Sequence, residues 1–125
     1  MILLLDAHAL VWWLVNDPKL SPVARGAIAD ATNDVIVSAA TAWELAIKRA
    51  AGKIDLPDDL AIAVDEAGFS GLPVTIQDAE VAASLPMLHR DPFDRMLVAH
   101  ARRIDATIVT RDAQLEPYGV PILPA

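Results

Sequence analysis

Five short apolar runs are spaced along the chain, and alanine-rich segments with helical spacing lie between them. The runs cover Ile2–Leu5, Val35–Ser38, Leu72–Ile76, Thr107–Thr110 and Val120–Leu123. Short apolar runs that alternate with helical segments are typical of parallel strands joined by crossover helices. We therefore expect an α/β three-layer sandwich, with a central parallel sheet of about five strands and helices on both faces.

Capping signals delimit the expected helices. Ser21 and Pro22 begin one helix as N-cap and first helical residue, and two other helices end at the first residues of Gly52–Pro57 and Gly68–Pro73. These two ranges are the expected loops. No repeat or linker interrupts the pattern, so residues 1–125 are expected to form a single domain with its own core.

The composition excludes several classes of site. The chain contains no cysteine, and therefore no disulfide framework, thiolate zinc site or catalytic thiol. Its hydrophobic content of 54% indicates a packed globular domain rather than a disordered chain. The N-terminus lacks the basic region of a secretory signal, and no apolar run approaches the roughly 20 residues that span a bilayer. We therefore expect a cytoplasmic protein without a membrane segment.

The formal net charge of −7 counts against a nucleic-acid partner, because such proteins neutralise phosphates with basic residues. The basic residues are nevertheless concentrated in two regions. One contains Lys48, Arg49 and Lys53, and the second contains Arg90, Arg95, Arg102, Arg103 and Arg111. A negative average can hide a local basic rim, so the net charge leaves the partner open.

Four acids are predicted to lie at one edge of the sheet. Asp6 and Asp112 each follow an expected strand, while Glu44 and Asp94 are expected in the first turns of helices. In an open parallel sheet, ligands bind outside the carboxyl ends of the strands, where the following helices also begin. The four carboxylates should therefore lie together although they are far apart in sequence.

Each acid also has a purely structural interpretation. Asp6 and Asp112 stand at N-cap positions, and Asp94 fits a near capping box that begins at Asp91. Glu44 is spaced to pair with Lys48, which is worth only a few tenths of a kcal/mol. Four such coincidences at one edge are less expected than a single shared cause. The sequence thus favours a functional cluster without excluding the caps.

Carboxylates gathered in this way require neutralisation. Two of them about 5 Å apart repel by roughly 3 kcal/mol at an effective dielectric of about 20. Oxygen ligands without cysteine or a histidine pair favour Mg²⁺, with Mn²⁺ as the alternative, over zinc. His8 and His89 are expected near this edge and His100 on a helix face away from it; for each, a structural role is the commoner outcome. No phosphate-binding glycine motif is present.

Three stretches carry a family resemblance that covers nearly the whole chain. LLLDAHALVWWL, VSAATAWELAIKRAAGKIDLP and LPMLHRDPFDRMLVAHARRIDATIVTRD resemble the PIN-domain ribonucleases and, more narrowly, the VapC-type toxins of bacterial toxin–antitoxin pairs. The resemblance implies a PIN-like fold. It also places the acidic constellation on Asp6, Glu44, Asp94 and Asp112, and an active-site hydroxyl on Thr110.

The same resemblance implies an activity and partners. The expected protein is a Mg²⁺- or Mn²⁺-dependent endoribonuclease that hydrolyses structured RNA such as tRNA. It is expected to form a homodimer and a larger toxin–antitoxin assembly, in which a cognate antitoxin inhibits it. Lysine or arginine from the antitoxin could enter the carboxylate pocket and displace the metal.

Four basic residues are candidates for binding RNA phosphates around the acids, namely Lys48, Arg49, Arg95 and Arg111. The alternative is that they form local salt bridges or point into solvent. Two rival functions also remain at this point. One is a non-catalytic PIN-fold module that binds antitoxin or RNA, and the other is a carboxylate-based phosphohydrolase that acts on another substrate.

Overall fold

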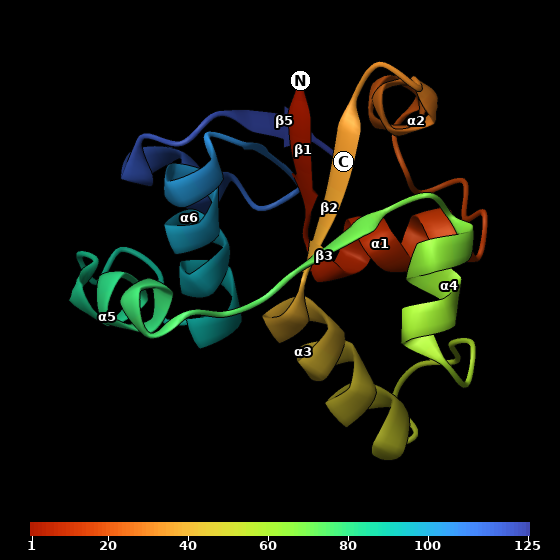
Figure 1. The fold of residues 1–125 in the computed structure, drawn as a ribbon, viewed down its shortest axis with the longest axis horizontal. Helices are drawn as coiled ribbons and strands as arrows, with labels where there is room; N and C mark the ends of the chain where they lie inside the picture. The colour runs from red at the N-terminus through yellow and green to blue at the C-terminus, as the bar shows by residue number, and fades with distance from the viewer.

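The computed structural model describes residues 1–125 and contains one five-stranded parallel sheet of order β3-β2-β1-β4-β5 (Figure 1). The strands are β1 (Ile2–Leu5), β2 (Asp34–Ser38), β3 (Ser70–Leu72), β4 (Thr107–Thr110) and β5 (Ile122–Pro124). The helices are α1 (Ala7–Leu14), α2 (Pro22–Ala29), α3 (Ala39–Ala50), α4 (Leu60–Glu66), α5 (Ile76–Ser84), α6 (Pro92–Ile104) and the short 3₁₀ helix η1 (Ala113–Tyr118). The predicted α/β sandwich with a five-stranded parallel sheet is therefore confirmed.

The central strand β1 divides the hydrophobic core into two parts. Leu3 and Leu5 face α1, α2 and α4, whereas Leu4 faces α6 and η1, because successive side chains of a strand point to opposite sides. All three leucines are fully buried. Figure 1 shows the consequence: α5 and α6 cover one face of the sheet and α1, α2 and α4 cover the other. None of the helices is long and apolar enough to cross a membrane.

Two strand predictions need correction. Of the run Leu72–Ile76 only Leu72 belongs to a strand, since β3 lies at Ser70–Leu72, inside the predicted loop Gly68–Pro73. Thr75 instead forms a capping box with Asp78 that starts α5. The last strand begins at Ile122 rather than Val120. The apolar pattern therefore does not set where these elements begin. A capping residue sets the start of α5, and a proline directly precedes β5.

The order of the strands determines where the acids meet. The chain adds β2 and β3 on one side of β1 and then crosses over to add β4 and β5 on the other. The carboxyl ends of β1 and β4 are therefore neighbours at the point where the strand order reverses, which is the usual place for a ligand site. The backbone N–H of Asp6 donates to the Val109 carbonyl at 3.1 Å and fixes these two ends together.

Candidate metal centre

Asp6 is both a helix cap and a buried acid. Its Oδ1 accepts a hydrogen bond from the backbone N–H of Ala9 at 2.8 Å, which caps α1. The residue is only 7% exposed. Burial raises the pKa of Asp6, although hydrogen bonds from the Thr110 hydroxyl and from Ala9 act in the opposite direction. The cap interpretation is thus correct, but the cap leaves the buried charge incompletely stabilised.

The end of β4 supplies Thr110 and Asp112. The Thr110 Oγ1 accepts a hydrogen bond from the backbone N–H of Asp112 at 3.0 Å and is almost fully buried. Asp112 Oδ1 caps η1 by accepting from the backbone N–H of Gln114 at 2.9 Å. Partial burial acts to raise the pKa of Asp112, but hydrogen bonds from His89 and Gln114 outweigh it and lower that pKa.

Asp94 carries the strongest electrostatic signal. Asp91 is the N-cap of α6 and accepts from the backbone N–H of Phe93 at 2.9 Å, so the Asp94 carboxylate is not used for capping. Burial, together with the charges of Asp91, Asp6 and Asp112, raises the pKa of Asp94 to about 7, against the opposing effect of His89. A carboxyl group in this state indicates negative charge that the protein itself does not neutralise.

Glu44 lies one turn later in its helix than predicted. Ser38 caps α3 and the helix begins at Ala39, so Glu44 falls in the second turn. Its Oε2 pairs with Lys48 Nζ at 2.9 Å, as the structural interpretation predicted. Glu44 is nevertheless near Asp6, because its charge contributes to raising the pKa of that residue. The ion pair therefore borders the acid cluster.

One cleft of about 410 Å³ collects all four predicted acids, which are Asp6, Glu44, Asp94 and Asp112. Its wall also contains Asp91 and Lys48. At its rim His8 stacks on Trp12 with ring centroids 5.5 Å apart, and the Arg111 guanidinium lies 4.4 Å from the Trp12 ring centroid. Thr110 does not line the cleft, but its hydroxyl hydrogen-bonds to Asp6 and accepts from the backbone N–H of Asp112. The four acids that the sequence predicts to lie together therefore do lie together in the fold.

His89 is the site residue that sequence reasoning ranked too low. Its Nε2 lies 2.7 Å from Asp112 Oδ2 and 3.2 Å from Asp94 Oδ2. The backbone N–H of Asp91 donates to His89 Nδ1 at 3.1 Å, which places the proton of the neutral ring on Nε2. Ligand atoms of His89, Asp94 and Asp112 all lie within 4.8 Å of one another. Only its position two residues before the Asp91 cap hinted at this role.

Two of the four predicted phosphate-binding residues do not line the cleft. Arg95 is 6% exposed, and its guanidinium donates to the carbonyl groups of Ala83, Leu85, Pro86 and His89. It holds the loop before α6 and is not available to a phosphate. Arg49 donates to the Pro57 carbonyl at 2.6 Å and does not line the cleft.

Lys48 and Arg111 do line the cleft. Arg111 also donates to the carbonyl groups of Lys19 and Ala125, which orients its guanidinium over Trp12. These two residues therefore remain candidates for phosphate contacts beside the acids.

The donors at this edge fit a divalent cation with oxygen ligands. Asp6, Asp94 and Asp112 present carboxylates to one cleft, and the raised pKa of Asp94 marks an excess of negative charge. Carboxylates without thiolates suit Mg²⁺ or Mn²⁺. His89 adds one nitrogen donor, which Mn²⁺ tolerates more readily than Mg²⁺.

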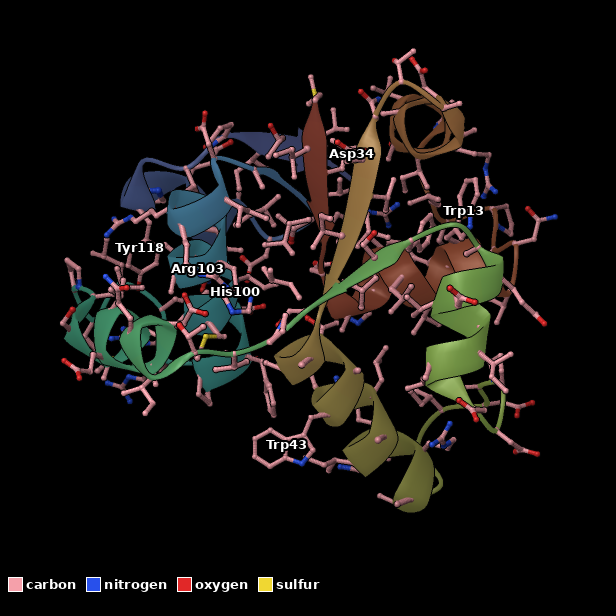
Figure 2. All side chains as sticks on the ribbon, viewed as in Figure 1. Trp13, Asp34, Trp43, His100, Arg103 and Tyr118 are labelled. Atoms are coloured by element: carbon pink, nitrogen blue, oxygen red, sulfur yellow. The ribbon has the colours of Figure 1, made fainter.

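A second histidine–aspartate cluster lies between α5 and α6, away from this cleft. The Arg103 guanidinium donates to both carboxylate oxygens of Asp78, with Nε–Oδ1 at 2.7 Å and Nη2–Oδ2 at 3.0 Å. His100 Nε2 lies 3.2 Å from Asp78 Oδ2 and is fully buried. Figure 2 shows His100 and Arg103 on α6 on the side that faces α5. His100 is therefore away from the acid cleft, as expected.

These observations define the class of protein. It is a parallel α/β domain with an acidic cleft at the point where the strand order reverses. A sequence model of the PIN domain matches residues 3–120, and the chain therefore belongs to the PIN-domain family. No curated protein sequence matches the chain significantly.

Solved structures with the same fold include three toxin–antitoxin complexes. VapBC2 from Rickettsia felis, bound to a DNA fragment from its promoter, is 16% identical over 98% of each chain with a TM-score of 0.71. FitAcB from Neisseria gonorrhoeae is 22% identical over 99% of this chain and 97% of that chain, with a TM-score of 0.68. DNA-bound VapBC from Salmonella typhimurium is 18% identical over 98% and 97% of the two chains, with a TM-score of 0.67. At such identities the likeness concerns the fold.

Proposed function

We propose that this PIN-domain chain is a metal-dependent endoribonuclease and the toxin of a VapC-type toxin–antitoxin pair. Its substrate is structured RNA, with tRNA the first candidate. The observation that carries the proposal is the acid cleft, where the pKa of Asp94 is raised to about 7 by burial and neighbouring carboxylates. An ordinary helix cap on a protein surface does not produce such a shift.

Asp6, Asp94 and Asp112 are the residues that would hold Mg²⁺ or Mn²⁺, with Glu44 and His89 beside them. When bound, the metal supplies an acidified water and stabilises charge on the phosphorus oxygens. Thr110 positions Asp112 through the Asp112 backbone N–H and hydrogen bonds to Asp6. The protein's own contribution is to fix these carboxylates before substrate arrives.

Cations at the rim of the cleft bind the substrate backbone. Lys48 and Arg111 line the cleft on different elements, and each is oriented by a partner within the protein. A phosphate placed over the acids would have these two cations within reach of its free oxygens. Their positions support RNA binding although the net charge is negative.

The proposed regulatory partner is a cognate antitoxin. Solved structures of the same fold include VapBC complexes, two of which are bound to DNA. A lysine or arginine side chain of an antitoxin would find five carboxylates in the cleft and could occupy the place of the metal. We also propose a homodimer and a larger toxin–antitoxin assembly, on the family resemblance alone.

Cleavage of a purified total tRNA pool tests the nuclease. The chain is incubated with Mg²⁺, with Mn²⁺ and with EDTA, beside Asp94→Asn and a matched Asp58→Asn control at an exposed acid outside the cleft. We expect discrete fragments with metal only, and a loss of at least about a hundredfold in D94N but not in D58N. If every RNA stays intact under every condition, the chain is a binding module instead.

A further inference from the structure

Two positively charged side chains next to the acid cleft have no partner in the protein. Seven of the ten lysine and arginine side chains donate hydrogen bonds, and the three that donate none are Lys19, Lys53 and Arg90. Lys53 and Arg90 are both exposed and line one open hollow of about 530 Å³. Two unpaired cations in one concavity indicate a site for negative charge from outside the chain.

This hollow is continuous with the acid cleft. Glu44, Lys48 and Asp91 line both concavities, so a ligand in one lies directly beside the other. Its remaining wall is partly apolar and includes Ile47 from α3 and Phe93 from the start of α6. The hollow therefore combines free cations with apolar surface, beside a cleft whose lining is mostly charged residues.

An exposed tryptophan stands at the edge of the hollow. Trp43 is 64% exposed, and its ring meets the Phe93 ring edge-on, with centroids 5.5 Å apart and planes at 69°. Trp43 and Ile47 are one turn apart on α3 and present the same apolar stripe. Figure 2 shows Trp43 projecting outward from α3 rather than toward the sheet. Phe93 thus restrains the indole while leaving most of it free.

We propose that this hollow is a second RNA subsite, in which Trp43 stacks on an unpaired base while Lys53 and Arg90 bind the neighbouring phosphates. An aromatic ring beside unpaired cations is the combination that binds single-stranded nucleic acid. A duplex keeps its bases stacked inside, so the subsite selects unpaired nucleotides next to the cleaved bond, as in a loop. This inference rests on the proposed function and specifies its substrate class.

Binding and cleavage are measured separately so that the two proposals can fail independently. The binding probe is a fluorescein-labelled single-stranded RNA of about 12 nucleotides, with the same sequence as a duplex for comparison. Titrations are done in EDTA, where metal-dependent cleavage is absent. The variants are Trp43→Ala, Trp43→Phe and the double variant K53A/R90A. The matched controls are Val23→Ala, an exposed apolar residue on α2, and Lys19→Ala, the third unpaired cation.

We expect W43A to weaken single-strand binding about tenfold and W43F to restore part of the loss, because one stacked base is removed and then replaced by a smaller ring. The double variant should lower the slope of log affinity against log salt by about 1.4, from two lost phosphate contacts. V23A and K19A should bind as the parent does, and the duplex should bind weakly to all.

The proposal is overturned if the parent binds no single-stranded RNA, or if W43A and K53A/R90A bind it as the parent does. It is also overturned if W43A leaves RNA binding intact and instead changes the sedimentation coefficient, since Trp43 would then lie in a protein interface. Binding that depends on Trp43 without cleavage in Mg²⁺ or Mn²⁺ would support the subsite and contradict the nuclease.

Discussion

The chain contains two histidine–aspartate clusters, and both use residues of α6 or of the loop before it. In one, His89 lies between Asp94 and Asp112; in the other, His100 lies against Asp78. Only the second includes an arginine, and the Arg103 and Thr75 hydrogen bonds overcome the effect of burial and lower the pKa of Asp78 to about 2. The pKa of Asp94 is raised to about 7 instead.

The difference teaches what separates a structural carboxylate from a functional one. Asp78 is almost fully buried, yet it accepts hydrogen bonds from the Thr75 backbone and from a bidentate guanidinium, so its charge is satisfied within the fold. Asp94 is more exposed but faces three other acids and has no arginine or lysine partner. Its negative charge can be neutralised only by a proton or by a cation from outside the protein.

The largest expected effect comes from removing the cation of the structural cluster. Arg103→Met leaves Asp78 buried without its bidentate partner and should lower the free energy of unfolding by about 3 kcal/mol. Urea denaturation at pH 7 measures this loss. Arg102→Met is the matched control, because Arg102 donates to the Tyr118 carbonyl and pairs with no carboxylate. An equal loss in both variants would contradict the structural role of the Asp78 pair.

The second prediction concerns the acid cleft, where removing a charged side chain should raise rather than lower the free energy of unfolding. Because the pKa of Asp94 is about 7 in the folded protein and near 3.8 in the unfolded chain, the folded protein binds an additional proton between these pH values. The free energy of unfolding should therefore fall as pH rises from about 4 to about 7 in metal-free buffer. Asp94→Asn removes this fall and should stabilise the protein by about 2 kcal/mol at pH 8.

Thermal unfolding in EDTA across this pH range checks the second prediction, with Asp58→Asn as the control. The contribution of Asp78 to stability should depend on pH in the opposite direction. Its folded pKa is about 2, so its contribution to stability is present above about pH 4 and is lost as pH falls toward 2. If D94N is destabilised at pH 8 without metal, the acid cleft is a structural network like that of Asp78.

The smallest expected effect separates the two histidines. His89→Ala should weaken Mn²⁺ binding about tenfold, because His89 orients Asp112 and adjoins Asp94. His100→Ala should leave Mn²⁺ binding unchanged, since His100 lies against Asp78 on the α5 side of α6. Isothermal titration with Mn²⁺ measures both affinities. Equal affinities for the two variants would remove His89 from the metal centre.

The sequence was sufficient where local patterns set the structure. The alternation of apolar runs and helices predicts the parallel sheet, and the strand ends then place Asp6 and Asp112 at one edge. The position of Asp91 before Pro92 predicts that it caps α6, which leaves Asp94 free. These inferences depend only on neighbouring residues and on the general geometry of α/β units.

Long-range contacts explain what the sequence did not reveal. His89 reaches Asp112 only because Arg95 holds the preceding loop by its carbonyl groups, and because the His89 backbone N–H donates to the Tyr118 hydroxyl 29 residues away. The same contacts bury Arg95, which by sequence resembles any exposed arginine beside an acid. Pairing of Asp78 with Arg103 likewise joins two helices and leaves no local pattern.

An NMR titration of the aspartate carboxyl groups, first in EDTA and then with Mg²⁺, tests most directly that the acid cleft holds charge that an external cation must neutralise. In EDTA, Asp94 should titrate near pH 7 and Asp78 near pH 2. Added Mg²⁺ should lower the midpoint of Asp94 and leave that of Asp78 unchanged. If Asp94 instead titrates near pH 4 and does not respond to Mg²⁺, the cleft is not a metal centre.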